Sequence, residues 1–84
     1  MPETVELNIP SHLQAGTLLR HYKGGLYRVE GACLIEATLE TGILYRPQQG
    51  NATHVLWVRP AAAFDVLVDT EQGPMRRFSA LQQA

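Results

Sequence analysis

The sequence predicts a mostly β domain: a small, SH3-like, partly open barrel of about five or six short strands with at most one or two helical turns. Three observations predict it. Apolar residues alternate with a period of two, glycine, proline or asparagine bounds each alternating segment, and helical periodicity is hard to find. The 84 residues have room for one core, so we expect residues 1–84 to form a single domain. A mixed α+β domain with a helix over residues 37–41 is the alternative.

The first elements are an edge strand and a helical turn. Apolar side chains alternate over residues 5–9 and stop at Pro10, which favours an edge strand. Residues 11–16 are expected to close one helical turn, with Ser11 as its N-cap.

A hairpin is the best-defined element of the sequence. Residues 17–22 and 26–34 flank a Lys-Gly-Gly stretch, and glycine supplies the positive φ that a tight turn needs. On the second strand, alternation places four residues on one inward face: Tyr27, Val29, Gly31 and Cys33.

The second half of the chain continues the β pattern. Residues 35–41 fit either a helix or a bent connection, and Gly42 opens the strand over 43–47. We then expect a strand over 54–60 with Val55, Trp57 and Arg59 on one face, followed by a helical turn from Pro60. A strand over 65–69 with Val66 and Val68 inward should lead into a turn over 70–75. The chain should end with a short strand at 76–78 and a frayed tail over 79–84.

Composition narrows the possible partners and location. The net charge of -1 gives no support for long-range attraction to nucleic acid or to an anionic membrane. Cys33 is the single cysteine, which fits a reducing compartment, and no signal peptide or membrane span is visible, so we expect a cytoplasmic protein. A chain this short has a limited core, which makes a homodimer a reasonable expectation.

The motifs His-Tyr-Lys-Gly, Tyr-x-Val-x-Gly, Tyr-Arg, Trp-Val-Arg-Pro with a downstream Phe, and Arg-Phe occur in this order. In this pattern, over about residues 16–78, the chain resembles the bacterial family known as domain of unknown function 1653. The motifs fall at His21–Gly24, Tyr27–Gly31, Ile43–Arg46, Trp57–Pro60 with Phe64, and Arg77–Phe78.

The resemblance implies a small β domain and no particular reaction, because the role of that family is not established. One segment departs from its pattern. Family members typically carry a polar Arg-His-Ser-Glu-Thr stretch where this chain reads Leu-Ile-Glu-Ala-Thr over residues 34–38, and only Thr38 fits. If that stretch lines the family's site, this chain has lost most of it.

The sequence offers little for catalysis or for a cofactor. Cys33 is expected to be inert packing, and His12, His21 and His54 lack the close spacing of common zinc motifs. The Lys-Gly-Gly stretch lacks the spacing of a phosphate-binding loop and is explained by the hairpin turn. We therefore expect no cofactor, no metal and no enzymatic activity.

Arginines beside aromatic residues are the strongest candidate for a site. Arg46 and Arg59 each follow an aromatic residue closely and precede a proline, which holds the arginine in an extended conformation at a strand end. Two such guanidinium groups would suit a carboxylate, a phosphate or a nucleobase. The structural alternative is that Trp57 is core and that Arg59 lies along its ring or pairs with Asp65 or Glu40.

The leading hypothesis is a non-enzymatic binding module for a small anionic ligand or a partner peptide. Its candidate residues are Tyr45, Arg46, Trp57, Arg59, His21, Tyr22 and Lys23. A nucleic-acid or nucleotide adaptor that uses Arg20, Lys23 and Arg28 beside Tyr22 is the alternative. A purely structural homo-oligomer is a third possibility.

Overall fold

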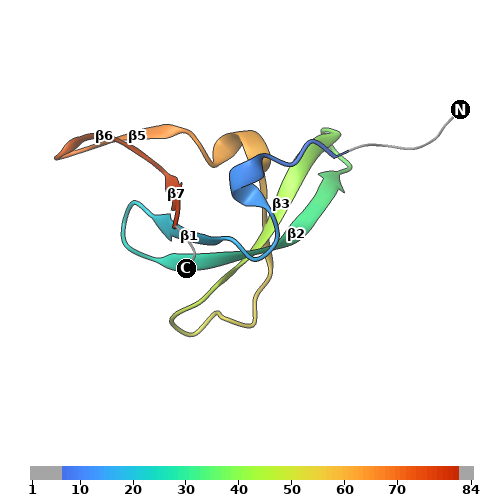
Figure 1. Cartoon of the computed structure of the whole chain (residues 1–84), viewed down its shortest axis with the longest axis horizontal. Coiled ribbons are helices and arrows are strands. Elements are labelled where there is room, and N and C mark those ends of the chain that lie inside the picture. Colours follow the sequence, from blue (N-terminus) through green and yellow to red (C-terminus); the bar gives the residue numbers. More distant parts are fainter. Residues whose placement is uncertain (1–6, 82–84) are drawn as a thin grey trace, which may run out of the picture.

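The computed structural model describes residues 7–81 (Figure 1). Its elements in chain order are the 3-10 turn η1 (Ser11–Leu13), the strands β1 (Leu18–His21), β2 (Leu26–Ile35), β3 (Glu40–Pro47) and β4 (Trp57–Pro60), the 3-10 turn η2 (Ala61–Ala63), and the strands β5 (Leu67–Thr70), β6 (Gly73–Arg76) and β7 (Phe78–Ala80).

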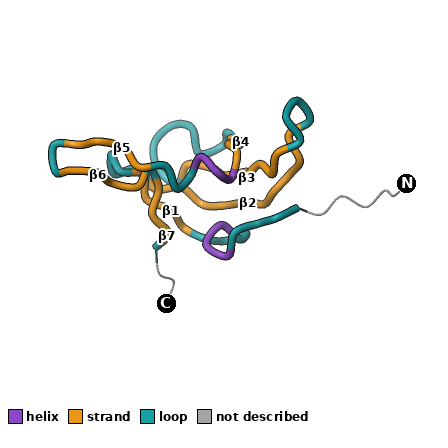
Figure 2. Tube along the Cα trace, turned by 90° about the horizontal axis from the view of Figure 1, so that it is seen from above, coloured by secondary structure: helices purple, strands orange, loops and turns teal. Residues whose placement is uncertain are grey.

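The described strands form two antiparallel sheets. One has five strands in the order β4-β3-β2-β1-β7, and the other is the β5–β6 hairpin. The mostly β class with two single helical turns is confirmed, with seven strands in residues 7–81, and these strands do not close into a barrel. Figures 1 and 2 show the β5–β6 hairpin and the turn end of the β2–β3 hairpin at opposite ends of the molecule.

The core lies on one face of the five-stranded sheet. Its buried side chains are Leu13, Leu19, Val29, Ile43, Tyr45, Phe64 and Phe78. The two helical turns bring Leu13 and Phe64 onto this face, and a hydrogen bond of 3.0 Å between His12 Nε2 and Asp65 joins them. Most of the core therefore comes from alternate positions of the strands, as a half-buried sheet requires.

The predicted β1–β2 hairpin is confirmed. Leu18 pairs with Arg28 and Arg20 with Leu26, and Gly24 in the turn has a φ of 102°, a conformation that glycine adopts without a steric penalty. The β2–β3 connection is a tight turn rather than a helix, so the mixed α+β alternative is wrong. Leu39 in that turn has a φ of 61° and is 70% exposed.

A β-bulge changes which side of β2 faces the core. The register shifts between Val29 and Gly31, so Val29 pairs with the buried Tyr45 but Ala32 pairs with the buried Ile43. Ala32 thus packs against the core, and the prediction that Cys33 faces inward is wrong. A bulge adds one residue to one strand, and this inverts the alternation beyond it.

Several details of the elements differ from the sequence-based expectation. Residues 7–9 form no strand, and the rest of the predicted 5–9 segment lies outside the described residues. The cap of η1 is Pro10 rather than Ser11. Val66 is 42% exposed rather than inward. Residues 73–75, predicted as part of a turn, belong to β6. The predicted strand over 76–78 is divided, with Arg76 in β6 and Phe78 in β7, and residues 79–80 belong to β7 instead of a tail.

Trp57 is not a core residue, so the structural alternative in which its indole fills the core is wrong. Strand β4 starts at Trp57, three residues later than predicted, and it is an edge strand of the sheet. Trp57 pairs with Tyr45 and so shares its face, but the indole lies at the end of an edge and is 48% exposed. An edge strand has a neighbour on one side only, which limits how much surface its side chains bury.

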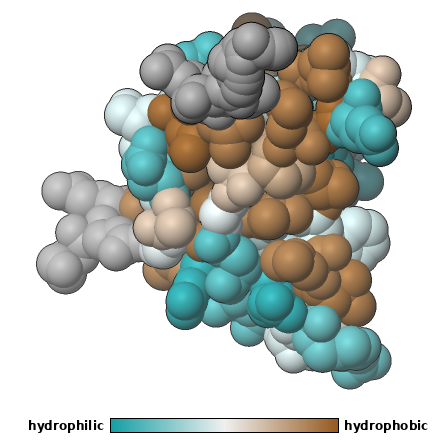
Figure 3. Space-filling model, turned by 90° about the vertical axis from the view of Figure 1, so that its right-hand side faces the viewer, coloured by the Kyte–Doolittle hydropathy of each residue, from teal (hydrophilic) through white to brown (hydrophobic). Residues whose placement is uncertain are grey.

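Apolar side chains also gather at the end of the molecule where the β2–β3 hairpin turns (Figure 3). Leu34 and Leu39 of this hairpin are exposed.

Among residues 7–81, no helix is long and apolar enough to span a bilayer.

Candidate functional site

Phe78 is the centre of an aromatic cluster. Its ring centroid lies 5.0 Å from that of His21, 5.6 Å from Tyr27, 5.8 Å from Tyr45 and 4.9 Å from Phe64. Three of these contacts are edge-to-face, which is a favoured geometry for aromatic pairs. The rings come from β1, β2, β3, β7 and the end of η2, so they join distant parts of the chain.

Arg59 lies across this cluster. Its Nε donates a hydrogen bond of 3.4 Å to the hydroxyl of Tyr45, and its guanidinium carbon lies 5.6 Å from the centroid of Phe78. Strands β4 and β7 are the two edges of the sheet, so Arg59 connects one edge with the other. Arg59 therefore has a structural role, as the sequence-based alternative proposed, but its partners are Tyr45 and Phe78 rather than Trp57 or Asp65. Asp65 instead forms a hydrogen bond with His12 and lies 3.8 Å from Arg76.

His21 lies beside three cationic side chains. Burial lowers the pKa of its imidazole, and the positive charges of Arg77, Lys23 and Arg59 lower that pKa further. The backbone N–H of Lys23 donates to Nδ1 of His21 over 3.1 Å, which places the proton of the neutral ring on Nε2. The imidazole is therefore held neutral among cations.

Arg77 is a residue that the site prediction missed. Its backbone N–H donates to the carbonyl of Val66, and its carbonyl accepts from the N–H of Tyr22, so both sides of the residue are fixed. Its Nε is buried and has no hydrogen-bond partner among the residues that the structure describes. A buried unpaired donor costs about 1–3 kcal/mol, which an acceptor on a ligand would offset.

We call His21, Lys23, Arg59 and Arg77 the basic cluster. His21, Lys23 and Arg59 belong to the predicted candidate set. Tyr45, which was also predicted, accepts a hydrogen bond from Arg59. The charges that shift the pKa of His21 are all positive, so the cluster is an electropositive site on an aromatic floor. Guanidinium groups in such a setting are suited to bind carboxylate or phosphate oxygens.

The other predicted candidates lie elsewhere. Arg46 alternates with the inward-facing Tyr45 and so lies on the opposite face of the sheet, where it is 3.7 Å from Glu30. The sheet therefore separates Arg46 from Arg59. Trp57 shares the face of Tyr45 but lies at the exposed end of β4. Tyr22 lines a separate cleft, beside the β5–β6 hairpin.

Three arginines form a row on the outer face of the sheet. Arg28 on β2 pairs directly with Arg46 on β3, and Arg20 on β1 lies on the same face of the neighbouring strand. Glu30 offsets part of this charge, because its carboxylate is 3.7 Å from both Arg28 and Arg46. Within residues 7–81, His, Cys, Asp and Glu side chains form no group of three suited to a metal ion.

Comparisons with known proteins agree with this description. The family model of the protein of unknown function DUF1653 matches residues 17–80. The chain is similar to the crystal structure of a DUF1653 protein from Bordetella bronchiseptica, with a TM-score of 0.72 and 28% identity over 84% of this chain and 90% of that one. No curated protein matches the chain. Because the family model covers most of its length, the chain belongs to the DUF1653 family.

Proposed function

We propose that the protein is a small binding module, and that the basic cluster binds a small anion that carries a carboxylate or a phosphate. One observation carries the proposal: the buried Nε of Arg77 has no hydrogen-bond partner among the described residues, and the charges of Arg59 and Lys23 act on the same imidazole as that of Arg77. Like charges held close together destabilise a fold, and ionisable groups with perturbed pKa values cluster at functional sites.

The surroundings of Arg59 support this role. The bond to Tyr45 uses its Nε, and the terminal nitrogens of the guanidinium carry four further N–H donors. The ring of Phe78 and the hydroxyl of Tyr45 hold the side chain in place before any ligand arrives. Such preorganisation reduces the conformational entropy that binding would otherwise cost.

Titration with inorganic phosphate and with acetate, followed by NMR chemical shifts, tests the proposal. We expect millimolar dissociation constants and shifts that centre on His21, Arg59 and Arg77. Arg59→Gln should weaken phosphate binding by about tenfold or more, because each charged hydrogen bond contributes about 1.5–3 kcal/mol.

Arg20→Gln is the matched control, because Arg20 is an exposed arginine on the other face of the sheet. It should leave phosphate binding unchanged. If Arg20→Gln weakens binding as much as Arg59→Gln does, the anion responds to overall charge and the proposed site is wrong.

The outer row of Arg20, Arg28 and Arg46 favours a second candidate function, binding of single-stranded nucleic acid. Labelled RNA and DNA should then bind at low salt, and the affinity should fall as salt rises, because phosphate contacts release counterions. Arg28→Gln should weaken this binding and leave phosphate binding at the basic cluster unchanged. Absence of binding at low salt would exclude this function.

A further inference from the structure

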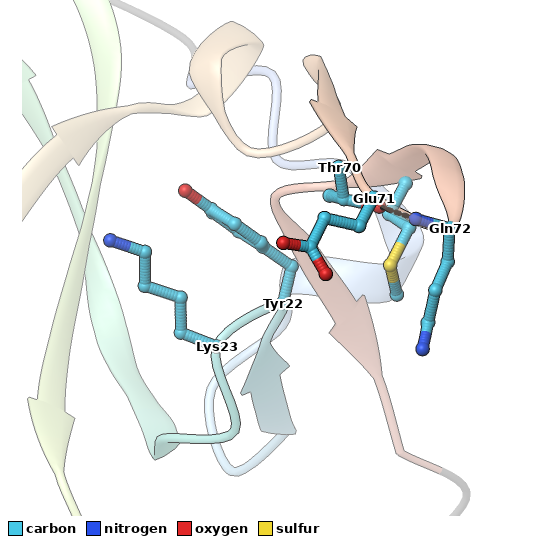
Figure 4. A pocket seen from close by; sticks show the side chains of 6 residues that line it. Tyr22, Lys23, Thr70, Glu71 and Gln72 are labelled. Atoms are coloured by element: carbon cyan, nitrogen blue, oxygen red, sulfur yellow. Dashed lines mark hydrogen bonds between the residues drawn. The ribbon is translucent and has the colours of Figure 1, made fainter.

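A cleft of about 520 Å³ lies between the β1–β2 turn and the β5–β6 hairpin (Figure 4). Its volume falls within the range of about 300–1,000 Å³ that is usual for small-molecule sites. The residues that line it are Tyr22, Lys23, Thr70, Glu71, Gln72 and Met75.

The two walls of the cleft carry opposite charges that are not paired. Lys23 comes from the β1–β2 turn and Glu71 from the tip of the β5–β6 hairpin. Neither forms an ion pair with the other or with any other residue that the structure describes. Figure 4 shows Lys23 extended beside the Tyr22 ring and Glu71 projecting from the hairpin toward the β1–β2 turn.

The cleft also has apolar lining. The ring of Tyr22 is stacked on His21 with centroids 4.6 Å apart, and the ammonium of Lys23 lies 5.7 Å from the Tyr22 centroid. The backbone N–H of Tyr22 donates to the carbonyl of Arg77, which fixes the backbone that carries the ring. Met75 lines the hairpin wall, and a thioether adapts readily to aromatic or aliphatic groups.

We propose that this cleft binds a small zwitterion of the amino-acid type. Lys23 takes the carboxylate, Glu71 takes the ammonium, and the apolar body of the ligand packs against Tyr22 and Met75. A simple anion would meet the carboxylate of Glu71, and a simple cation would meet Lys23, so a ligand with both charges fits best. This site differs from the basic cluster, which contains no carboxylate, although the two share Lys23.

Three probes with the same ring separate the charge requirements: L-phenylalanine carries both charges, phenylacetate only the negative one, and 2-phenylethylamine only the positive one. We expect NMR titration to give L-phenylalanine an affinity about tenfold above that of either analogue, because it gains a second charged contact. Glu71→Gln should reduce L-phenylalanine binding to the level of phenylacetate. Lys23→Gln should reduce it to the level of 2-phenylethylamine.

Two variants serve as controls. Glu36→Gln removes an exposed carboxylate at the β2–β3 turn, away from the cleft, and Arg59→Gln weakens the basic cluster but not the cleft. Followed by the shifts of Thr70, Glu71 and Gln72, which lie in the cleft and outside the basic cluster, both variants should retain wild-type affinity for L-phenylalanine. The proposal is overturned if L-phenylalanine fails to shift these residues at millimolar concentration, if phenylacetate shifts them with equal affinity, or if Arg59→Gln abolishes their shifts, which would place the carboxylate at the basic cluster.

Discussion

Replacing Phe78 and Trp57 by leucine tests which aromatic residue holds the domain together. Phe78 is 4% exposed and packs against four rings, whereas Trp57 is 48% exposed. Four ring contacts at about 0.5 kcal/mol each, with about 1 kcal/mol for the change of shape, give a loss of about 3 kcal/mol for Phe78→Leu. For Trp57→Leu we expect about 1 kcal/mol, because roughly half of the indole surface is buried and leucine replaces part of that burial.

Urea unfolding followed by far-ultraviolet circular dichroism measures both changes without relying on the fluorescence of the single tryptophan. With a slope of about 1 kcal/mol/M, Phe78→Leu should lower the midpoint by about 3 M and Trp57→Leu by about 1 M. A loss for Trp57→Leu equal to or greater than that for Phe78→Leu would refute the assignment of the core to the aromatic cluster.

Three further predictions concern the clamp, the imidazole and the edge strand. Arg59→Lys keeps the charge but loses the bond from Nε to Tyr45, so thermal or urea melts should show a loss of about 0.5–1.5 kcal/mol; an unchanged stability would mean that the bond contributes nothing. The pKa of His21 is lowered in the folded state, so the unfolded state binds more protons below about pH 6.5. The free energy of unfolding should therefore rise as the pH increases from the lowered pKa of the folded state to about 6.5, and it should stay level above that pH. His21→Gln should reduce that slope in urea melts at several pH values, and an unchanged slope would contradict it. Leu56 and Val58 are exposed at edge strand β4, so the predicted homodimer should appear in light scattering at high concentration, and a monomer throughout would refute it.

Local signals were enough to predict the β1–β2 hairpin. The Lys-Gly-Gly turn specified the β1–β2 pairing because Gly24 takes a positive φ that few other residues tolerate. The bulge after Val29 was not predictable in the same way, because alternation continues in the sequence through the point where the register shifts. The wrong orientation of Cys33 follows directly from that shift.

The candidate site was predicted in part for a related reason. His21, Lys23 and Arg59 were identified because they stand beside turns and prolines. Arg77 was missed because its place depends on β7 pairing with β1, a contact between segments far apart in the sequence. Arg46 shows the converse error: its local sequence is like that of Arg59, but the two side chains lie on opposite faces of the sheet.

The β5–β6 hairpin gives the cleft one wall that is less firmly held than the other. A two-stranded ribbon is marginally stable by itself, and this one is joined to the five-stranded sheet through the hydrogen bond from Arg77 to Val66 and the adjacent bond from Tyr22 to Arg77. Local opening can therefore separate Glu71 from Lys23 while the aromatic core stays intact. A ligand that contacts both walls would slow amide hydrogen exchange across the ribbon, so its occupancy would determine how rigid this end of the molecule is.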